Sequence, residues 1–242
     1  IFNRTTSSSY NDKKVFIMKY KDIYVIVPAY NEEKVIKEII SNLLNKFSNV
    51  IVIDDGSTDG TLNEIKDFDV KIIHHEINLG VGAAVQTGFE YVSMIDSAHA
   101  VITFDADGQH LVKDAESMAK EAMISDADII FGTRFPKFAR NIPLVKRIIL
   151  KIITKITDFM TGVSLSDAHN GLKAFKVSAL RNLELNFSAY SYESELITQV
   201  SKKKLKYTEM PTDIKYTNYS IKKGQKLSNG LLIIEDLLKL WK

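Results

Sequence analysis

Cysteine is absent from this chain of 242 residues, so disulfides, thiolate metal sites and a cysteine nucleophile are excluded. The absence fits the reducing cytoplasm, where we expect the protein to reside. Apolar runs of about 18 residues are also missing, and the sequence therefore predicts no helix that spans a bilayer. Neither sign of charge is in excess, since the formal net charge is +2, which argues against a general nucleic-acid binder.

The order of the apolar runs predicts the fold class. Short apolar segments lie near residues 24–28, 50–54, 70–74, 100–105 and 128–133, and helical patterns separate them near 32–47, 60–67, 80–95 and 111–124. This alternation is typical of an α/β fold with a mainly parallel, twisted sheet and helices on both faces. We expect one domain over residues 22–242, preceded by a flexible tail at 1–21 with a natural start at Met18.

Oxygen ligands gather after the fourth apolar run, in the sequence Asp105-Ala-Asp107-Gly-Gln109-His110. Hard cations such as Mg²⁺ and Mn²⁺ prefer oxygen ligands and leave coordination positions open for substrate phosphates. We therefore expect Asp105, Asp107 and Gln109 to hold a divalent metal, and His110 to form a hydrogen bond instead of binding the ion. The structural alternative is that Asp-Gly simply turns the chain after a strand.

Two earlier runs also end in polar residues. Asp54 and Asp55 follow the run at 50–53, and the first run leads through Pro28 into Tyr30, Asn31 and Glu32. In open α/β sheets, ligands bind at the carboxyl ends of the strands, where these residues should gather. For the segment that follows Asp54 and Asp55, the structural alternative is that Ser57 or Asp59 caps the next helix.

Four motifs in order resemble the family 2 glycosyltransferases, and most closely the dolichol-phosphate mannosyltransferase and polyprenyl-phosphate glycosyltransferase group. They are Pro-Ala-Tyr-Asn-Glu at 28–32, Asp-Asp-Gly-Ser-Thr-Asp-Gly-Thr at 54–61, Asn-Leu-Gly-Val-Gly-Ala-Ala at 78–84 and the metal motif at 105–110. The resemblance covers about residues 22–218. It implies a GT-A fold with a Rossmann-like nucleotide-binding half at 22–135 and an acceptor half at 136–242, a nucleoside-diphosphate sugar donor, a divalent metal and inverting transfer.

The resemblance also implies roles for single residues. Donor contacts are expected from Pro28, Ala29, Tyr30, Glu32, Asp54, Asp55, Gly80, Asp105 and Arg134. Arg134, at the end of the fifth run, suits phosphate because a guanidinium matches phosphate oxygens in a bidentate fashion. Gly80 would let the backbone approach the donor, although close packing of a helix on the sheet explains it equally well.

Asp167 is the candidate for acceptor chemistry. The stretch Asp167-Ala-His169-Asn170-Gly171-Leu-Lys173 resembles the family element Asp-x-x-x-Gly-Phe-Lys, which lies at the reaction centre, with leucine in place of phenylalanine. A hydroxyl acceptor would need Asp167 as its base, whereas a polyprenyl phosphate is already an anion and would need Asp167 only for positioning. An Asx turn before a strand is the structural alternative. On the helix expected next, Glu193 and Glu195 are two apart and cannot share one face.

Basic and amphipathic segments complete the second half. Residues 216–226 are polar and basic, which predicts a mobile loop in which Lys223 contacts substrate phosphates. Residues 142–160 and 231–241 predict amphipathic helices that lie either on a membrane surface or on the protein core.

We therefore expect an inverting, metal-dependent glycosyltransferase, cytoplasmic or peripheral on the cytoplasmic face of the membrane. Its acceptor would be lipid-linked, a polyprenyl phosphate or a glycan intermediate of a cell-surface polysaccharide. The alternatives are transfer to a soluble saccharide hydroxyl, a sugar nucleotidyltransferase, and a non-catalytic nucleotide-binding module.

Overall fold

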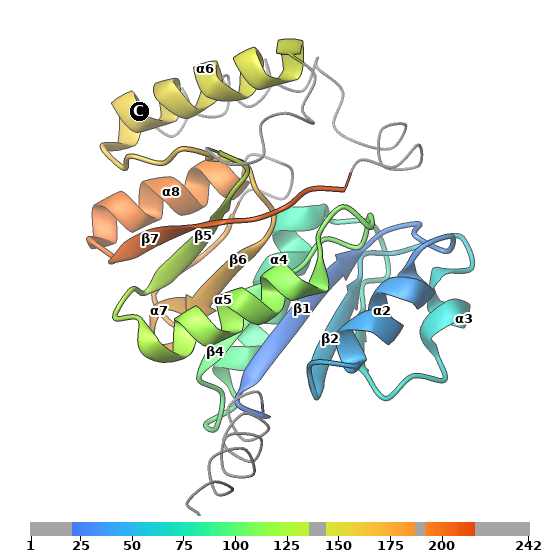
Figure 1. Cartoon of the computed structure of the whole chain (residues 1–242). Helices are drawn as coiled ribbons and strands as arrows, with labels where there is room; N and C mark the ends of the chain where they lie inside the picture. Colours follow the sequence, from blue (N-terminus) through green and yellow to red (C-terminus); the bar gives the residue numbers. More distant parts are fainter. Residues whose placement is uncertain (1–20, 136–143, 187–191, 216–242) are drawn as a thin grey trace, which may run out of the picture.

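A seven-stranded sheet in the order β3-β2-β1-β4-β6-β5-β7 forms the centre of the computed structural model, which describes residues 21–135, 144–186 and 192–215 (Figure 1). The strands are β1 (Ile23–Ala29), β2 (Asn49–Asp54), β3 (Lys71–His74), β4 (Ala100–Thr103), β5 (Ile129–Thr133), β6 (Lys173–Lys176) and β7 (Tyr207–Pro211). The helices are α2 (Ile36–Leu44), α3 (Thr61–Ile65), α4 (Val81–Ser93), α5 (Val112–Ile124), α6 (Leu144–Thr161), α7 (Val177–Leu180) and α8 (Tyr192–Lys203). The predicted α/β class is confirmed, because five of these strands are the five expected apolar runs.

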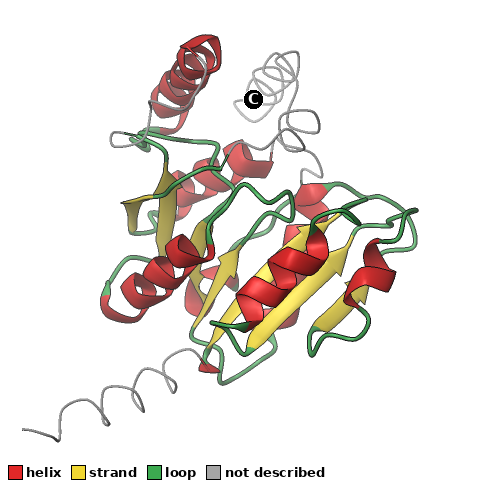
Figure 2. Cartoon of the chain, turned by 45° about the vertical axis from the view of Figure 1, so that its right-hand side comes forward, coloured by secondary structure: helices red, strands yellow, loops and turns green. Residues whose placement is uncertain are grey.

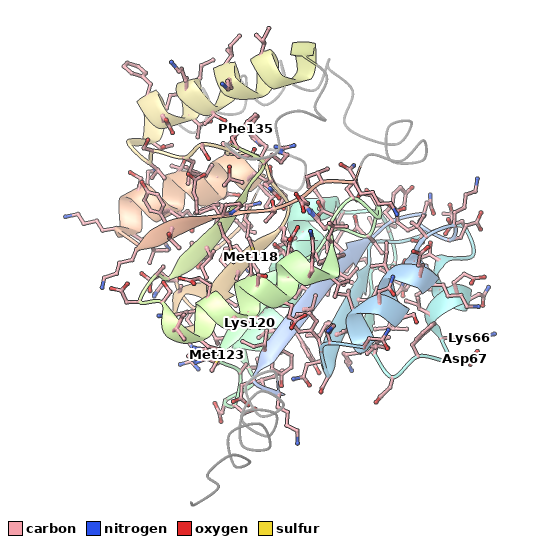
Figure 3. The ribbon with its side chains drawn as sticks, in the orientation of Figure 1. Lys66, Asp67, Met118, Lys120, Met123 and Phe135 are labelled. Carbon is pink, nitrogen blue, oxygen red and sulfur yellow. The ribbon has the colours of Figure 1, made fainter. Side chains whose placement is uncertain are left out.

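Helices cover both faces of the sheet, as Figures 1 and 2 show. On one face, Val25 of β1 belongs to the same core as Met118 of α5, and on the other, Ile26 packs in a core with Phe89 of α4. Neighbouring residues of one strand point to opposite faces, so a strand buried on both sides must be apolar throughout. Figure 3 labels Met118 and Lys120 on α5, of which the first is fully buried and the second is exposed.

The first helix is shorter than the pattern predicted. The expectation was a helix over 32–47, but α2 begins at Ile36. Asn31 has a φ of 54°, in the left-handed region, and the backbone N–H of Val35 bonds to the carbonyl of Glu32 at 3.0 Å. The chain therefore makes a tight turn after β1 before the helix starts, which keeps residues 30–35 at the sheet edge.

Strand β6 breaks the parallel arrangement. It lies between β4 and β5 and runs antiparallel to both, with Lys173 opposite Thr103 of β4 and Phe131 of β5. This strand was not part of the expected alternation of strands and helices. Because β6 runs in the opposite direction, the residues that precede it in the chain lie at the edge of the sheet where β4 and β5 end.

The second half of the chain adds α6, α8 and β7. β7 pairs in parallel with β5, and α6 contacts α8 beyond that end of the sheet (Figure 1). The predicted helix at 142–160 is confirmed over Leu144–Thr161. After β7, Ile214 makes an isolated bridge with His110 within the described residues.

The tail at 1–20, the basic loop with Lys223, and the helix expected at 231–241 lie outside the described residues. Among the residues that are described, no helix combines the length and the apolar character that crossing a membrane requires.

Candidate functional site

Four strands deliver polar side chains to one edge of the sheet. β1 is parallel to β2 and β4, and β6 runs antiparallel to both β4 and β5, so β1, β2, β4 and β5 end at the same edge. The segment at 167–172 arrives there because it precedes β6. This edge therefore collects every predicted site residue that lies within the described part of the chain.

The loops after β1 and β2 are tied together by hydrogen bonds. The backbone N–H of Asn31 donates to Ser57 Oγ at 2.9 Å, and Asn31 Oδ1 accepts from the N–H of Thr58 at 2.8 Å. The N–H of Glu32 donates to Thr61 Oγ1 at 2.8 Å. The two loops thus form one surface.

The residues predicted around the nucleoside occupy this surface. Pro28 and Ala29 end β1 and are buried beside Ile53 and Asp54 of β2. Tyr30 is 41% exposed, and it is the predicted nucleoside contact with the most accessible side chain. An aromatic ring at this edge can pack against a planar ligand.

Asp54 and Asp55 each pair with a histidine that follows them across the sheet. Asp54 is opposite His74 in the register of β2 and β3, and its Oδ2 lies 2.7 Å from His74 Nδ1. Asp55 Oδ1 lies 2.8 Å from His75 Nδ1. The spacing of these adjacent histidines fits no metal site, so the sequence alone indicates no role for them. The available signal was the register of two parallel strands that both end in paired polar residues.

Asp55 also fixes the turn that leads into α4. Its Oδ1 accepts from the N–H of Leu79 at 2.9 Å, and its Oδ2 accepts from the N–H of Gly80 at 2.8 Å. Gly80 has a φ of 94°, which favours glycine because a side chain would be strained there. Asp55 is thus a structural anchor for residues 75–80, and Gly80 donates its N–H to that anchor.

The predicted metal motif forms a compact cluster after β4. Asp107 accepts from the backbone N–H of Gln109 at 2.9 Å and from Gln109 Nε2 at 2.6 Å. Asp105 Oδ2 lies 3.0 Å from His110 Nε2, so the hydrogen bond expected of His110 is present. Burial and the neighbouring carboxylate of Asp105 raise the pKa of Asp107. A cation bound beside Asp107 would stabilise the charge that burial and Asp105 disfavour.

This donor set fits a hard divalent ion that relies on substrate phosphates. Within the described residues, no group of three or more His, Asp or Glu side chains is arranged to hold a metal alone. Mg²⁺ commonly uses only one or two carboxylates and takes its other oxygens from phosphates and water. Asp105, Asp107 and the amide oxygen of Gln109 supply such a partial set.

Gly171 packs directly against Asp105. A β-carbon at Gly171 would lie 2.0 Å from Asp105 Oδ2, so no other residue fits without moving that carboxylate. Thr103 Oγ1, at the end of β4, donates to the carbonyl of Gly171 at 2.7 Å. The 167–172 segment and the metal motif are therefore held in contact.

Arg134 and Asp167 form a buried two-pronged ion pair. Arg134 Nε donates to Asp167 Oδ2 at 2.6 Å, Nη2 donates to Oδ1 at 2.5 Å, and the backbone N–H of Arg134 donates to Oδ2 at 3.0 Å. Burial alone would raise the pKa of Asp167, but the guanidinium of Arg134 outweighs burial and lowers it. The two predicted catalytic residues thus meet each other.

A second buried charge cluster lies beside this pair. Lys173, 1% exposed, donates from Nζ to Glu193 Oε1 at 2.8 Å, and His169 Nδ1 lies 2.9 Å from Glu193 Oε2. Burial would raise the pKa of Glu193, but Lys173 and His169 lower it to about 2. The roles of Lys173 and His169 were not predicted, because their common partner lies at least 20 residues further along the chain.

Glu193 and Glu195 have different neighbours, as their spacing predicted. Glu195 accepts from the backbone N–H of Asn186, whereas Glu193 accepts from Lys173 and lies 2.9 Å from His169 Nδ1. Glu193 is thus the member of this pair whose hydrogen bonds to Lys173 and His169 are established. Lys223 lies outside the described residues.

The chain resembles known glycosyltransferases over most of its length. The sequence model of the family "Glycosyl transferase family 2" matches residues 24–184. The UDP-N-acetylglucosamine–dolichyl-phosphate N-acetylglucosaminyltransferase of Methanococcus voltae is 36% identical over 92% of this chain and 97% of its own length. The polyprenol monophosphomannose synthase of Mycolicibacterium smegmatis is 26% identical over 89% of this chain and 84% of its own length.

A solved structure confirms the fold. Glucosyl-3-phosphoglycerate synthase from Mycobacterium tuberculosis, in complex with Mn²⁺, uridine diphosphate and glucosyl-3-phosphoglycerate, superimposes with a TM-score of 0.68. The match covers 99% of this chain and 86% of that one at 18% identity. The expected GT-A architecture is thus shown.

Proposed function

The chain belongs to glycosyl transferase family 2, and from that premise we propose that it moves a sugar, with inversion, from a nucleoside-diphosphate sugar to a polyprenyl phosphate. The observation that carries this proposal is the contact between the carboxylates after β4 and the segment before β6, where a β-carbon at Gly171 would overlap Asp105. Donor groups and acceptor groups would then meet at that contact. The names of the relatives from Methanococcus and Mycolicibacterium, which include dolichyl phosphate and polyprenol, support the choice of acceptor.

On the donor side, Asp105, Asp107 and Gln109 would hold Mg²⁺ or Mn²⁺ together with the diphosphate. The bound ion would neutralise charge on the leaving nucleoside diphosphate. Asp55 would shape the nucleoside site indirectly, by holding residues 75–80 against the end of β2. Tyr30, on the surface formed by the first two loops, would face the nucleoside.

On the acceptor side, the Arg134 and Asp167 pair argues for positioning. Both oxygens of Asp167 accept from Arg134, and the guanidinium lowers the pKa of this carboxyl, so Asp167 has little tendency to take up a proton. A hydroxyl acceptor needs a base within hydrogen-bond reach, whereas a phosphate acceptor is already an anion. The weak basicity of Asp167 therefore supports a phosphate nucleophile, with Asp167 holding Arg134 in place.

We also propose that α6 contacts the lipid surface that carries such an acceptor. Ile148, Ile152 and Phe159 are 50%, 51% and 84% exposed, and the intervening Lys151 and Lys155 are exposed as well. Apolar and cationic side chains together suit the boundary of an anionic bilayer. Phe135 is buried below α6 (Figure 3), and the Nζ of Lys151 lies 5.8 Å from the centre of its ring.

The function is tested with the full chain, Mn²⁺ or Mg²⁺, and a panel of uridine and guanosine diphosphate sugars. Short-chain polyprenyl phosphates and soluble saccharides serve as acceptors, and nucleoside-diphosphate release and the glycosylated product are both measured. We expect a metal-dependent product on polyprenyl phosphate. Transfer only to a saccharide hydroxyl, pyrophosphate release from a nucleoside triphosphate, or tight donor binding without turnover would each refute the proposal.

Membrane contact is tested by co-sedimentation with vesicles that contain anionic lipid. We expect Phe159→Glu to reduce binding. Ile124→Glu is the matched control, because Ile124 is 75% exposed on α5 and equally apolar. Equal loss of binding in both variants would contradict a specific role for α6.

A further inference from the structure

His169 has a ring nitrogen that the protein does not satisfy. Its side chain is 5% exposed, and Nδ1 lies 2.9 Å from Glu193 Oε2. Nε2 is buried and has no hydrogen-bond partner among the residues that the structure describes. Buried polar atoms are nearly always hydrogen-bonded, so an unpartnered one indicates a water or a ligand that completes the site.

Glu193 orients the imidazole. The pKa of Glu193 is lowered to about 2, so this carboxylate is ionised at neutral pH and acts only as an acceptor. The proton on Nδ1 must then point to Glu193, and Nε2 faces away from it. Nε2 carries a lone pair in the neutral ring and an N–H in the charged ring.

The charged side chains around His169 have a net charge of zero when the imidazole itself is left out. Lys173, at the start of β6, bonds to Glu193 on α8, and Arg134, at the end of β5, bonds to Asp167 in the preceding loop. Arg134 Nη2 also donates to the backbone carbonyl of His169 at 2.8 Å. Two cations thus face two carboxylates, and protonation of His169 would give this cluster of five residues a net positive charge.

His169 is also well placed along the chain. It lies between Asp167, which pairs with Arg134, and Gly171, which abuts Asp105 of the metal motif. The short segment that carries His169 therefore connects the residue that binds Arg134 with the residue that abuts Asp105. The segment also enters β6 at Lys173, whose side chain shares the Glu193 carboxylate with His169.

Resting on the proposed function, we propose that His169 binds the acceptor phosphate, with its protonated Nε2 donating a hydrogen bond to a phosphate oxygen while Glu193 stabilises the charged ring. A dianionic or monoanionic phosphate would attract a proton onto His169 as it binds, because the ring then supplies the net positive charge of the cluster. The acceptor thereby keeps its own nucleophilic oxygen anionic. His169 acts here as a binding residue and removes no proton from the substrate.

The pH dependence of the KM for a short-chain polyprenyl phosphate tests this role. In the wild type, the KM should rise with pH as His169 loses its proton. In His169→Gln, which can donate a hydrogen bond but cannot be charged, the KM should be about 10- to 100-fold higher at low pH and independent of pH, since a charge-assisted hydrogen bond is lost. The KM for the donor and the affinity for uridine diphosphate with Mn²⁺ should stay unchanged.

Two further variants separate this role from a general structural one. Glu193→Gln keeps an oxygen that can accept a hydrogen bond but removes the charge, so the rise of KM should shift to lower pH. His99→Gln is the matched control, because His99 is exposed and lies at the opposite end of β4. It should leave the KM and its pH dependence as in the wild type.

A binding measurement is independent of turnover. The five histidines give Cε1–H resonances that NMR can resolve, and the signal missing from His169→Gln identifies His169. Addition of farnesyl phosphate, or of inorganic phosphate, should move the titration of that signal to higher pH and leave His99 unaffected. Farnesyl phosphate acting at much lower concentration than inorganic phosphate would indicate a lipid-linked acceptor.

The outcomes separate the two proposals. A wild type that transfers to polyprenyl phosphate, with His169→Gln retaining the same KM and pH profile, overturns the role of His169 and leaves the proposed function standing. A KM that falls with rising pH, or a kcat that is lost at low pH through His169, would make the ring a base for a hydroxyl acceptor and would overturn the phosphate role. If polyprenyl phosphate is no substrate and neither phosphate probe shifts the His169 signal, both proposals fail.

Discussion

Gly171 and Asp105 are in such close contact that a β-carbon on the glycine would lie 2.0 Å from Oδ2 of the aspartate. The two residues belong to different parts of the chain, one following β4 and the other preceding β6. Thr103 Oγ1 donates to the carbonyl of Gly171 at 2.7 Å and holds the two segments in this position. The orientation of one carboxylate in the predicted metal motif thus depends on the absence of a side chain at position 171.

Gly171→Ala should therefore weaken metal-dependent donor binding. The added methyl group would displace the Asp105 carboxylate, so we expect the enhancement of uridine diphosphate binding by Mn²⁺ to fall at least about tenfold, the loss of one charged interaction. Calorimetric titrations with and without Mn²⁺ measure this. Gly88→Ala is the control, because its β-carbon would lie 2.7 Å from Ile26 in the core, which lowers stability without touching the site. Normal metal enhancement in Gly171→Ala would contradict the argument.

Asp107→Asn should abolish metal-dependent donor binding and transfer while the fold remains intact. Burial and Asp105 disfavour the charge on Asp107, so an amide at this position removes a repulsion, and the melting temperature should not fall. Thermal melts and nucleotide titrations with Mn²⁺ provide the two readouts. Asp96→Asn, at an exposed position after α4, should change neither. Metal enhancement that survives in Asp107→Asn would rule out this residue as a ligand.

Asp167→Asn should lower stability more than it lowers turnover. The change leaves the buried guanidinium of Arg134 without its carboxylate, which costs about 3–5 kcal/mol. Loss of a general base would instead reduce kcat by roughly 10²- to 10⁴-fold. Denaturant unfolding and kcat on polyprenyl phosphate distinguish the two, and Arg134→Gln combined with Asp167→Asn is the matched control, since it removes both charges and should recover part of the stability. A stable Asp167→Asn protein with a kcat reduced to that extent would restore the general-base role.

Acid should destabilise the protein through Glu193. The pKa of this carboxyl is lowered from 4.5 to about 2, so the folded state binds its proton less readily than the unfolded chain does. The resulting stabilisation is complete above pH 4.5 and is lost as the pH falls towards 2. Urea unfolding between these pH values should show a steeper fall for the wild type than for Glu193→Gln. Parallel profiles for the two proteins would contradict the assignment.

Asp55→Ala should weaken nucleoside binding even without metal, because it releases residues 75–80 from β2. The change removes acceptors for the N–H groups of Leu79 and Gly80. Uridine and guanosine nucleotides in calcium-free and magnesium-free buffer provide the test, with Asp67→Ala as the control, since Asp67 is exposed beyond α3 (Figure 3). Asp54→Ala is expected to weaken binding as well, and unchanged affinity in both variants would make the two carboxylates purely structural.

The parallel part of the fold was predictable because its signals are local. The strands β1, β2 and β4 contain apolar runs that polar residues follow. A strand buried on both faces is apolar over nearly its whole length, so such runs can be recognised in the sequence. The start of α2 was not predictable from periodicity, because the left-handed backbone of Asn31 delays the helix. The pattern typical of a helix extends over residues 33–35, but these residues form a turn.

Strand β6 and its partners were hidden because their stability is not local. A four-residue strand that begins and ends with lysine does not look buried, yet Lys173 is 1% exposed because Glu193 neutralises it from α8. The pairs of Asp54 with His74 and of Asp55 with His75 depend in the same way on strand register. Sequence indicated which residues are polar at the sheet edge, and only the fold shows which of them are already paired.

The reversed direction of β6 also governs how the protein can be made. β6 lies between β4 and β5, so during synthesis one edge of each of these strands stays open until residues 173–176 have left the ribosome. An uncovered strand edge attracts other chains and promotes aggregation. A fragment that ends at residue 135, the expected boundary of the nucleotide-binding half, lacks β6 and β7 and should therefore aggregate. Strands from both parts of the chain form one sheet, so the two parts depend on each other to fold.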